Sequence, residues 1–177
     1  MKGKPFFVVS LFALTGLSMA VWGDGQLPLI LTILYDNYPC RPGLRTAWGF
    51  SCLVELGKQT ILFDTGGSAD ILLSNMRALG IDPRRIQNVV LSHIHGDHVG
   101  GLFGFLEENN AVTVYLPASF PQEFKTRVQR SGAQVVEVQG PMKIGEGVYS
   151  TGELGTWIKE QALAVESPEG LVVITGC

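Results

Sequence analysis

Short apolar runs alternate with amphipathic stretches along most of the chain. The runs are rich in Leu, Ile and Val and are separated by glycine-containing turns, which predicts strands. Stretches in which apolar residues recur every three or four positions predict helices. The predicted strands span residues 29–35, 50–56, 60–63, 88–91, 112–116, 134–138, 147–150, 162–166 and 171–175. The predicted helices span residues 68–79, 98–108 and 120–130, with a helical turn at 82–85.

The order of these elements indicates the fold class. Gly57-Lys58-Gln59 is a short connection between two strands and predicts a hairpin near the start. The middle of the chain then runs strand, helix, strand, helix, strand. This mixture predicts an α/β (or α+β) domain, built in layers around a partly antiparallel sheet.

The first segment has the features of a secretory signal. Lys2 and Lys4 precede an apolar stretch at 6–17, and Ser18-Met19-Ala20 offers a cleavage site between small residues. We therefore expect residues 1–20, or at most residues 1–25, to be a signal peptide that directs export to the periplasm or the medium. The alternative is an uncleaved membrane anchor, because residues 5–23 carry no charge. The domain itself is expected over residues 26–177.

Composition narrows the function further. The chain has 177 residues, 46% of them apolar, which excludes a disordered protein. The formal charge of −3 and the pI of about 5.6 argue against a nucleic-acid partner, so we expect a small-molecule substrate. The sequence leaves the oligomeric state open. It also leaves open whether Cys40 and Cys52 form a disulfide or remain thiols.

All three histidines of the chain lie within six residues. They belong to the segment Ser92-His93-Ile94-His95-Gly96-Asp97-His98, which directly follows the predicted strand at 88–91. His93 and His95 are two apart in extended chain, so their side chains point to the same side. Gly96 permits a turn that brings Asp97 and His98 back toward them. Imidazole and carboxylate ligands suit zinc, and also iron or manganese.

These four side chains fit two ions better than one. Asp97 and His98 are adjacent, and their side chains leave the backbone in directions that do not complete a tetrahedron with His93 and His95. Two ions about 3.5–4 Å apart would each take one pair. Asp64, which ends the strand at 60–63 before a glycine turn, is expected to support the histidines by hydrogen bonds.

Together, Phe63-Asp64-Thr65-Gly66 and His93-x-His95-x-Asp97-His98 closely resemble the metallo-β-lactamase superfamily. Further stretches resemble its branch of dihydropterin–ribofuranosylaminobenzene phosphate synthases: Leu34-Tyr35-Asp36-Asn37-Tyr38, Trp48-Gly49-Phe50-Ser51, Glu160-Gln161-Ala162-Leu163 and Thr175-Gly176-Cys177. The resemblance implies an αββα sandwich with two metal ions at one edge.

The resemblance also implies roles for individual residues. His93 and His95 match two ligands of the first metal, and Asp97 and His98 match two ligands of the second. Asp97 is in addition the expected catalytic residue, and Asp64 matches the supporting aspartate.

In relatives, further ligands follow the Thr-Gly-Cys stretch. We therefore expect this sequence to be the N-terminal part of the sandwich, with most of the second half missing. Cys177 is a conceivable substitute ligand, but the end of a strand is expected to place it poorly.

The expected function is that of an exported two-metal enzyme, with zinc as the first choice of metal. A metal-bound hydroxide would attack an ester, amide or phosphate bond. One alternative is a transferase of the synthase type, in which a pterin ring could stack on Trp48, although export argues against a biosynthetic role. The other alternative is an inactive or degenerate metal-binding fragment.

Overall fold

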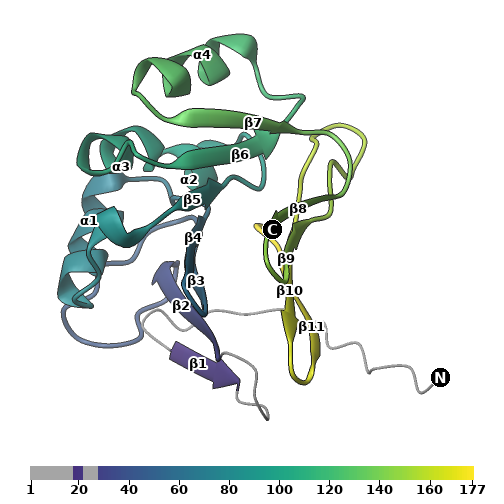
Figure 1. Cartoon of the computed structure of the whole chain (residues 1–177). Coiled ribbons are helices and arrows are strands. Elements are labelled where there is room, and N and C mark those ends of the chain that lie inside the picture. Colours follow the sequence, from purple (N-terminus) through teal and green to yellow (C-terminus); the bar gives the residue numbers. More distant parts are fainter. Residues whose placement is uncertain (1–17, 22–27) are drawn as a thin grey trace.

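Strand pairing divides the chain into two sheets (Figure 1). The structure is a computed structural model that describes residues 18–21 and 28–177. The larger sheet contains seven strands in sequence order: β1 (Ser18–Val21), β2 (Leu29–Tyr35), β3 (Ser51–Leu56), β4 (Gln59–Phe63), β5 (Asn88–Val90), β6 (Thr113–Pro117) and β7 (Gln134–Val138). Neighbouring strands are antiparallel from β1 to β4 and parallel from β4 to β7.

The smaller sheet is antiparallel and has the order β11-β10-β9-β8. Its strands are β8 (Met142–Gly145), β9 (Val148–Ser150), β10 (Leu163–Ser167) and β11 (Gly170–Ile174). Figure 1 shows this sheet facing one side of the larger sheet, with its yellow strands on the right of the view.

The helices lie on the opposite side of the larger sheet (Figure 1). They are α1 (Ala69–Ala78), the 3₁₀ turn η1 (Pro83–Arg85), α2 (Gly96–Val99), α3 (Leu102–Glu108) and α4 (Gln122–Arg130). Among the described residues, no helix covers the outer face of the smaller sheet. The described chain therefore forms three layers: helices, sheet and sheet.

Strand β4 shows how the sequence builds both interfaces of the larger sheet. Leu62 packs among the helices, whereas Ile61 and Phe63 pack against the smaller sheet. All three are at most 1% exposed. Side chains alternate across a strand, so an apolar run buried on both faces supplies two cores. This arrangement fixes β4 between the helices and the smaller sheet, and Asp64 directly follows the end of β4.

The structure confirms the α/β class and most predicted elements, but it corrects the helix expected at 98–108. A four-residue helix, α2, starts earlier, at Gly96, and the helix α3 begins only at Leu102. Between them, Gly100 and Gly101 pass against the backbone carbonyls of Gly67 and Thr65. A Cβ atom at these glycines would lie 2.5 Å and 2.2 Å from those oxygens. The two glycines therefore permit a contact that a continuous helix of larger residues would prevent.

The predicted pattern also missed strand β8. Its hairpin with β9 carries a register shift between Lys143 and Gly145, which breaks the regular alternation that indicates a strand.

The predicted signal lies mostly outside the described residues, which begin at 18. Residues 18–21 form β1, which pairs with β2 through the register Ser18 opposite Thr32. No helix in the described part of the chain has the length and apolar character needed to cross a membrane.

The sequence left open whether Cys40 and Cys52 form a disulfide or remain thiols. In the structure both are free thiols. Cys52 lies on β3 and is 1% exposed. Burial raises its pKa to about 12, which keeps it protonated and unreactive at neutral pH.

Candidate metal centre

The histidine segment lies where parallel strands β4 and β5 end. Asp64 directly follows β4, and Leu91 separates β5 from Ser92 and His93. Because the two strands are parallel, their carboxyl ends meet at one edge of the sheet. The chain then turns through Gly96 into α2, which carries Asp97 and His98 back over the same edge.

The ligand atoms of the segment converge in two pairs. His93 Nε2 lies 3.1 Å from His95 Nδ1, and His98 Nε2 lies 3.4 Å from Asp97 Oδ2. Two nitrogen or oxygen ligands of one tetrahedral zinc ion are separated by about 3.3 Å, given metal–ligand bonds of about 2.0–2.1 Å. Both separations are therefore compatible with one metal ion per pair. The donor types also fit zinc, iron or manganese.

Asp64 and Ser92 orient the two buried histidines. His98 Nδ1 donates to Asp64 Oδ2 at 2.8 Å, and Ser92 Oγ donates to the same oxygen at 2.6 Å. His93 Nδ1 lies 2.8 Å from Ser92 Oγ and donates to it when that nitrogen carries the proton. In this arrangement the Nε2 atoms of both rings keep a free lone pair. The pattern is the usual way in which a carboxylate fixes metal-binding imidazoles.

Asp64 is also held by its backbone. It is fully buried, and its φ of 55° is the only positive value at a non-glycine residue in the described chain. Aspartate and asparagine tolerate this conformation better than other side chains do. Its second carboxylate oxygen, Oδ1, accepts the Ser92 backbone N–H at 2.6 Å. The carboxylate therefore binds both the histidine loop and the helix that follows it.

Burial and charge set the protonation of the two buried rings. Burial, followed by the neighbouring His98, lowers the pKa of His93, which favours the neutral form that metals bind. Burial by itself would lower the pKa of His98. The hydrogen bond to Asp64 and the negative charges of Asp64 and Asp97 outweigh this effect and raise it.

Backbone contacts fix α2 against the loops beside it. Thr65 donates through its N–H and its hydroxyl to the carbonyl of His98, at 2.7 Å and 2.9 Å. Phe50 N–H donates to the carbonyl of Asp97 at 3.3 Å. Gly49 makes this approach possible, because a Cβ atom there would lie 2.2 Å from the Asp97 oxygen.

The smaller sheet contacts the histidine loop through Gln161, which precedes β10. Gln161 N–H donates to the Ser92 carbonyl at 2.9 Å, and its side-chain amide donates to the Leu91 carbonyl at 2.8 Å. Ser150 Oγ donates to Gln161 Oε1 at 2.6 Å. The residue is 2% exposed. These bonds connect the two sheets directly behind the site.

Sequence reasoning assigned no role to Ser92 or Gln161. Ser92 could have been noticed as a polar residue between a buried strand and the first histidine. Gln161 gives no comparable signal, because its partner Leu91, next to the histidine segment, lies 70 residues away along the chain.

Cys177 is better placed than the sequence suggested. Its Sγ lies 3.7 Å from His93 Nε2 and 3.6 Å from His98 Nε2. Strand β11 pairs with β10 over its full length and leads Gly176 against Ser92 and Asp64. A Cβ atom on Gly176 would lie 2.1 Å from Ser92 Oγ, so only glycine fits this close contact. The expectation of a poorly placed terminal residue is therefore wrong.

A small cavity opens beside Cys177. It has a volume of about 210 Å³, and the loop between β9 and β10 forms most of its wall. Its lining combines the apolar side chains of Leu154 and Ile158 with Glu160. Leu154 and Glu160 exchange backbone hydrogen bonds of 2.7 Å and 3.0 Å, which close the loop that carries these residues. Space for a substrate group is therefore available next to the ligand cluster.

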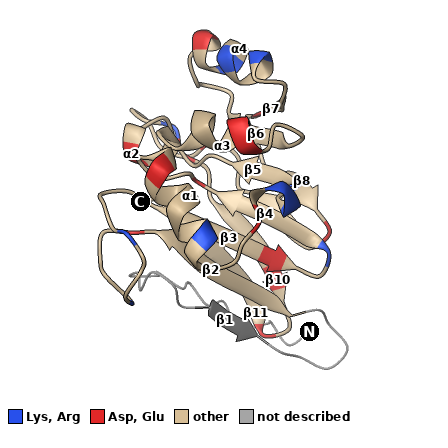
Figure 2. Cartoon of the chain, turned by 90° about the vertical axis from the view of Figure 1, so that its left-hand side faces the viewer, with Lys and Arg blue, Asp and Glu red and all other residues tan. Residues whose placement is uncertain are grey.

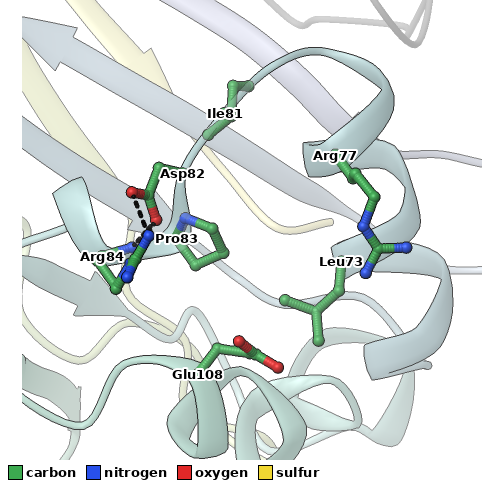
Figure 3. Close-up of a pocket in the computed structure, with 7 residues that line it drawn as sticks. All are labelled: Leu73, Arg77, Ile81, Asp82, Pro83, Arg84 and Glu108. Carbon is green, nitrogen blue, oxygen red and sulfur yellow. Dashed lines mark hydrogen bonds and ion pairs between the residues drawn. The ribbon is translucent and has the colours of Figure 1, made fainter.

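A larger cavity, of about 420 Å³, lies elsewhere (Figure 3). Its lining residues are Leu73, Arg77, Ile81, Asp82, Pro83, Arg84 and Glu108. Asp82 and Arg84 are paired with each other, as the dashed lines in Figure 3 show. Residues 81–84 precede β5, so they lie toward the opposite edge of the sheet from the histidines, which follow β5.

Comparisons with known proteins agree with this architecture. The model of the metallo-beta-lactamase superfamily matches residues 49–176. A 7,8-dihydropterin-6-methyl-4-(beta-D-ribofuranosyl)-aminobenzene-5'-phosphate synthase from Methanocaldococcus jannaschii is 28% identical, over 73% of this chain and 60% of the relative. A ribonuclease Z from Lactobacillus gasseri is 35% identical, over 42% of this chain and 25% of the relative.

A solved structure supports the same fold. The metallo-beta-lactamase fold protein YhfI from Bacillus subtilis matches with a TM-score of 0.64 at 18% identity, over 84% of this chain and 61% of that protein. The chain thus spans about three fifths of the length of both the synthase and YhfI. The extent of the family match and the shared arrangement of sheets and helices lead to one conclusion: the chain belongs to the metallo-beta-lactamase superfamily.

Proposed function

We propose that this chain carries the metal-binding edge of a two-metal hydrolase that acts on an ester, amide or phosphate bond. The observation that carries the proposal is the convergence of two ligand pairs, His93 with His95 and Asp97 with His98, at separations compatible with metal binding. The opposite nitrogens of His93 and His98 face Ser92 and Asp64, so the two Nε2 atoms are directed toward the other ligands of the cluster.

A pair of divalent ions bound there, with zinc as the first choice, would lower the pKa of a coordinated water and polarise the bond to be cleaved. The protein's own residues orient and support the ligands. Asp64 accepts the His98 Nδ1 proton and so directs His98 Nε2 toward the metal, and Ser92 Oγ, which donates to the same carboxylate, contacts His93 Nδ1. Asp97, on the first turn of α2, contributes its carboxylate from the more open side of the cluster.

The surroundings of the cluster favour a small-molecule substrate. The cavity beside Cys177 is below the usual size range of about 300–1,000 Å³ for ligand pockets, which suits one small group of a substrate. Acidic and basic residues are interspersed over the helical face in Figure 2, without a continuous basic band. We also propose that the protein acts after export, because of the basic and apolar segment at 2–17.

The test of this function measures metal content and hydrolysis together. The purified chain is incubated with zinc, manganese or iron and then assayed with bis(para-nitrophenyl) phosphate, para-nitrophenyl acetate and nitrocefin. We expect two metal ions per chain and hydrolysis of at least one probe, which a chelator abolishes and added metal restores. A folded chain that retains no metal would contradict the proposal and support a degenerate domain.

A synthase-type transferase is the second candidate, and two observations favour it. The Methanocaldococcus jannaschii relative, named as a synthase, matches most of this chain. Trp48 is 75% exposed rather than part of the core, and it precedes Gly49, which contacts Asp97. An exposed indole near the ligand cluster is suited to stacking on a flat heterocycle such as a pterin.

Tryptophan fluorescence distinguishes this candidate. If the pterin ring stacks on Trp48, a reduced pterin should quench the fluorescence of the chain, and Trp48→Leu should remove most of the saturable quenching. Trp157→Leu is the matched control, because Trp157 is 99% exposed and lies on the loop between β9 and β10. Equal quenching in both variants would argue against the synthase.

A further inference from the structure

Cys177 brings a third kind of ligand to the histidine cluster. Its Sγ, His93 Nε2 and His98 Nε2 all lie within 4.8 Å of one another. The sulfur lies almost equally far from the two nitrogens, at 3.7 Å and 3.6 Å. His93 belongs to one ligand pair and His98 to the other, so the thiol lies between the two pairs.

Each of these two sulfur–nitrogen distances matches the separation of two ligands on one tetrahedral ion, so a thiolate shared by two ions fits both. Zinc–sulfur bonds of about 2.3 Å and zinc–nitrogen bonds of about 2.0–2.1 Å give a sulfur–nitrogen separation of about 3.6 Å in a tetrahedron. A direct hydrogen bond between a thiol and an imidazole would not by itself require the sulfur to be equidistant from two rings. Thiolate is also a preferred zinc ligand.

The position of the thiol is built into the fold. His93 is fully buried and His98 is 2% exposed, and their Nδ1 atoms face Ser92 and Asp64, so both Nε2 atoms are directed toward the sulfur. Gly176 is held against Ser92 and Asp64, the same residues that orient the rings. The support that fixes the histidines therefore also fixes the backbone next to Cys177.

We propose that the Cys177 thiolate is a metal ligand that connects the His93–His95 pair with the Asp97–His98 pair. The inference rests on the proposed two-metal function and adds a donor to it. On metal binding the thiol proton passes to solvent, and the sulfur forms a metal–thiolate bond without any change in oxidation state. Each ligand pair thereby gains a third protein donor.

Cobalt(II) tests this inference without an activity assay. The metal-free chain is titrated with cobalt under anaerobic conditions in a non-thiol reductant, and its absorption spectrum is recorded. We expect visible d–d bands together with a near-ultraviolet thiolate-to-cobalt charge-transfer band. Cys177→Ser and Cys177→Ala should lose the charge-transfer band and bind cobalt at least ~10-fold more weakly. Cys40→Ser, which changes a partly exposed thiol outside the cluster, should keep both.

The outcomes separate this inference from the function on which it rests. Bound cobalt without a charge-transfer band, or a band that persists in Cys177→Ala, would overturn the role of Cys177 and leave the two-metal function intact. A chain that is folded by circular dichroism but binds no cobalt would overturn both. The variants test the side chain itself, because Cys177 is exposed and lies outside the core.

Discussion

Replacing Asp64 by Asn should weaken metal binding by about 10–100-fold, the range typical for a carboxylate that supports metal-binding imidazoles. The Asn side chain accepts the left-handed backbone at this position, so the change is mainly electrostatic. Its amide group would nevertheless face the donors Ser92 Oγ and His98 Nδ1, which now donate to a carboxylate oxygen. Isothermal titration with zinc measures the affinity.

Asp64→Ala should add a loss of stability to the loss of metal. It leaves buried partners without an acceptor, which costs about 3–5 kcal/mol when a buried ion pair loses one member. Urea unfolding of the metal-free chain measures this loss. Asp70→Asn is the matched control, because Asp70 is exposed on the first turn of α1 and should change neither property. Zinc affinity that is unchanged in Asp64→Asn would show that the carboxylate does not support the site.

His95→Ala should reduce metal-dependent hydrolysis about a thousandfold or more while leaving the fold intact. The variant removes one of the two ligand atoms of the first pair, and a catalytic metal contributes several kcal/mol to transition-state stabilisation. His95 is exposed, unlike His93 and His98, so little packing is lost. Turnover of whichever chromogenic probe the wild-type chain hydrolyses measures the effect.

A stability measurement and two further variants show whether the loss of turnover in His95→Ala comes from the lost ligand. The unfolding free energy of metal-free His95→Ala should stay within about 0.5 kcal/mol of the wild type, as for other exposed substitutions. His93→Ala should lose both metal and stability, because His93 is fully buried. Gln129→Ala, an exposed change on α4, controls for handling of the variants. Wild-type turnover in His95→Ala would contradict its assignment as a ligand.

The candidate ligands could be found from the sequence because they are local. His93 and His95 alternate along extended chain, and Gly96 and the first turn of α2 return Asp97 and His98 to the same place. No distant part of the chain is needed to form the two pairs, His93 with His95 and Asp97 with His98. Strand β4 could be predicted in the same way, since a short apolar run bounded by turns predicts a strand.

The helix at 98–108 and strand β8 could not be delimited in this way. Helices α2 and α3 are separated at Gly100 and Gly101, which lie against the carbonyls of Gly67 and Thr65, residues about 33–36 positions earlier in the chain. Strand β8 depends on a hairpin with a register shift, and such irregular pairing leaves little periodic signal.

The sequence by itself determined the α/β class and the composition of the histidine cluster, because periodicity and the spacing of the motif are properties of neighbouring residues. Only the tertiary structure brought Cys177 to His93 across 84 residues, and only it placed Gln161 behind Ser92. Both contacts depend on how the smaller sheet packs against the larger one. Long-range packing depends on many weak contacts spread along the chain, so no single sequence motif predicts it.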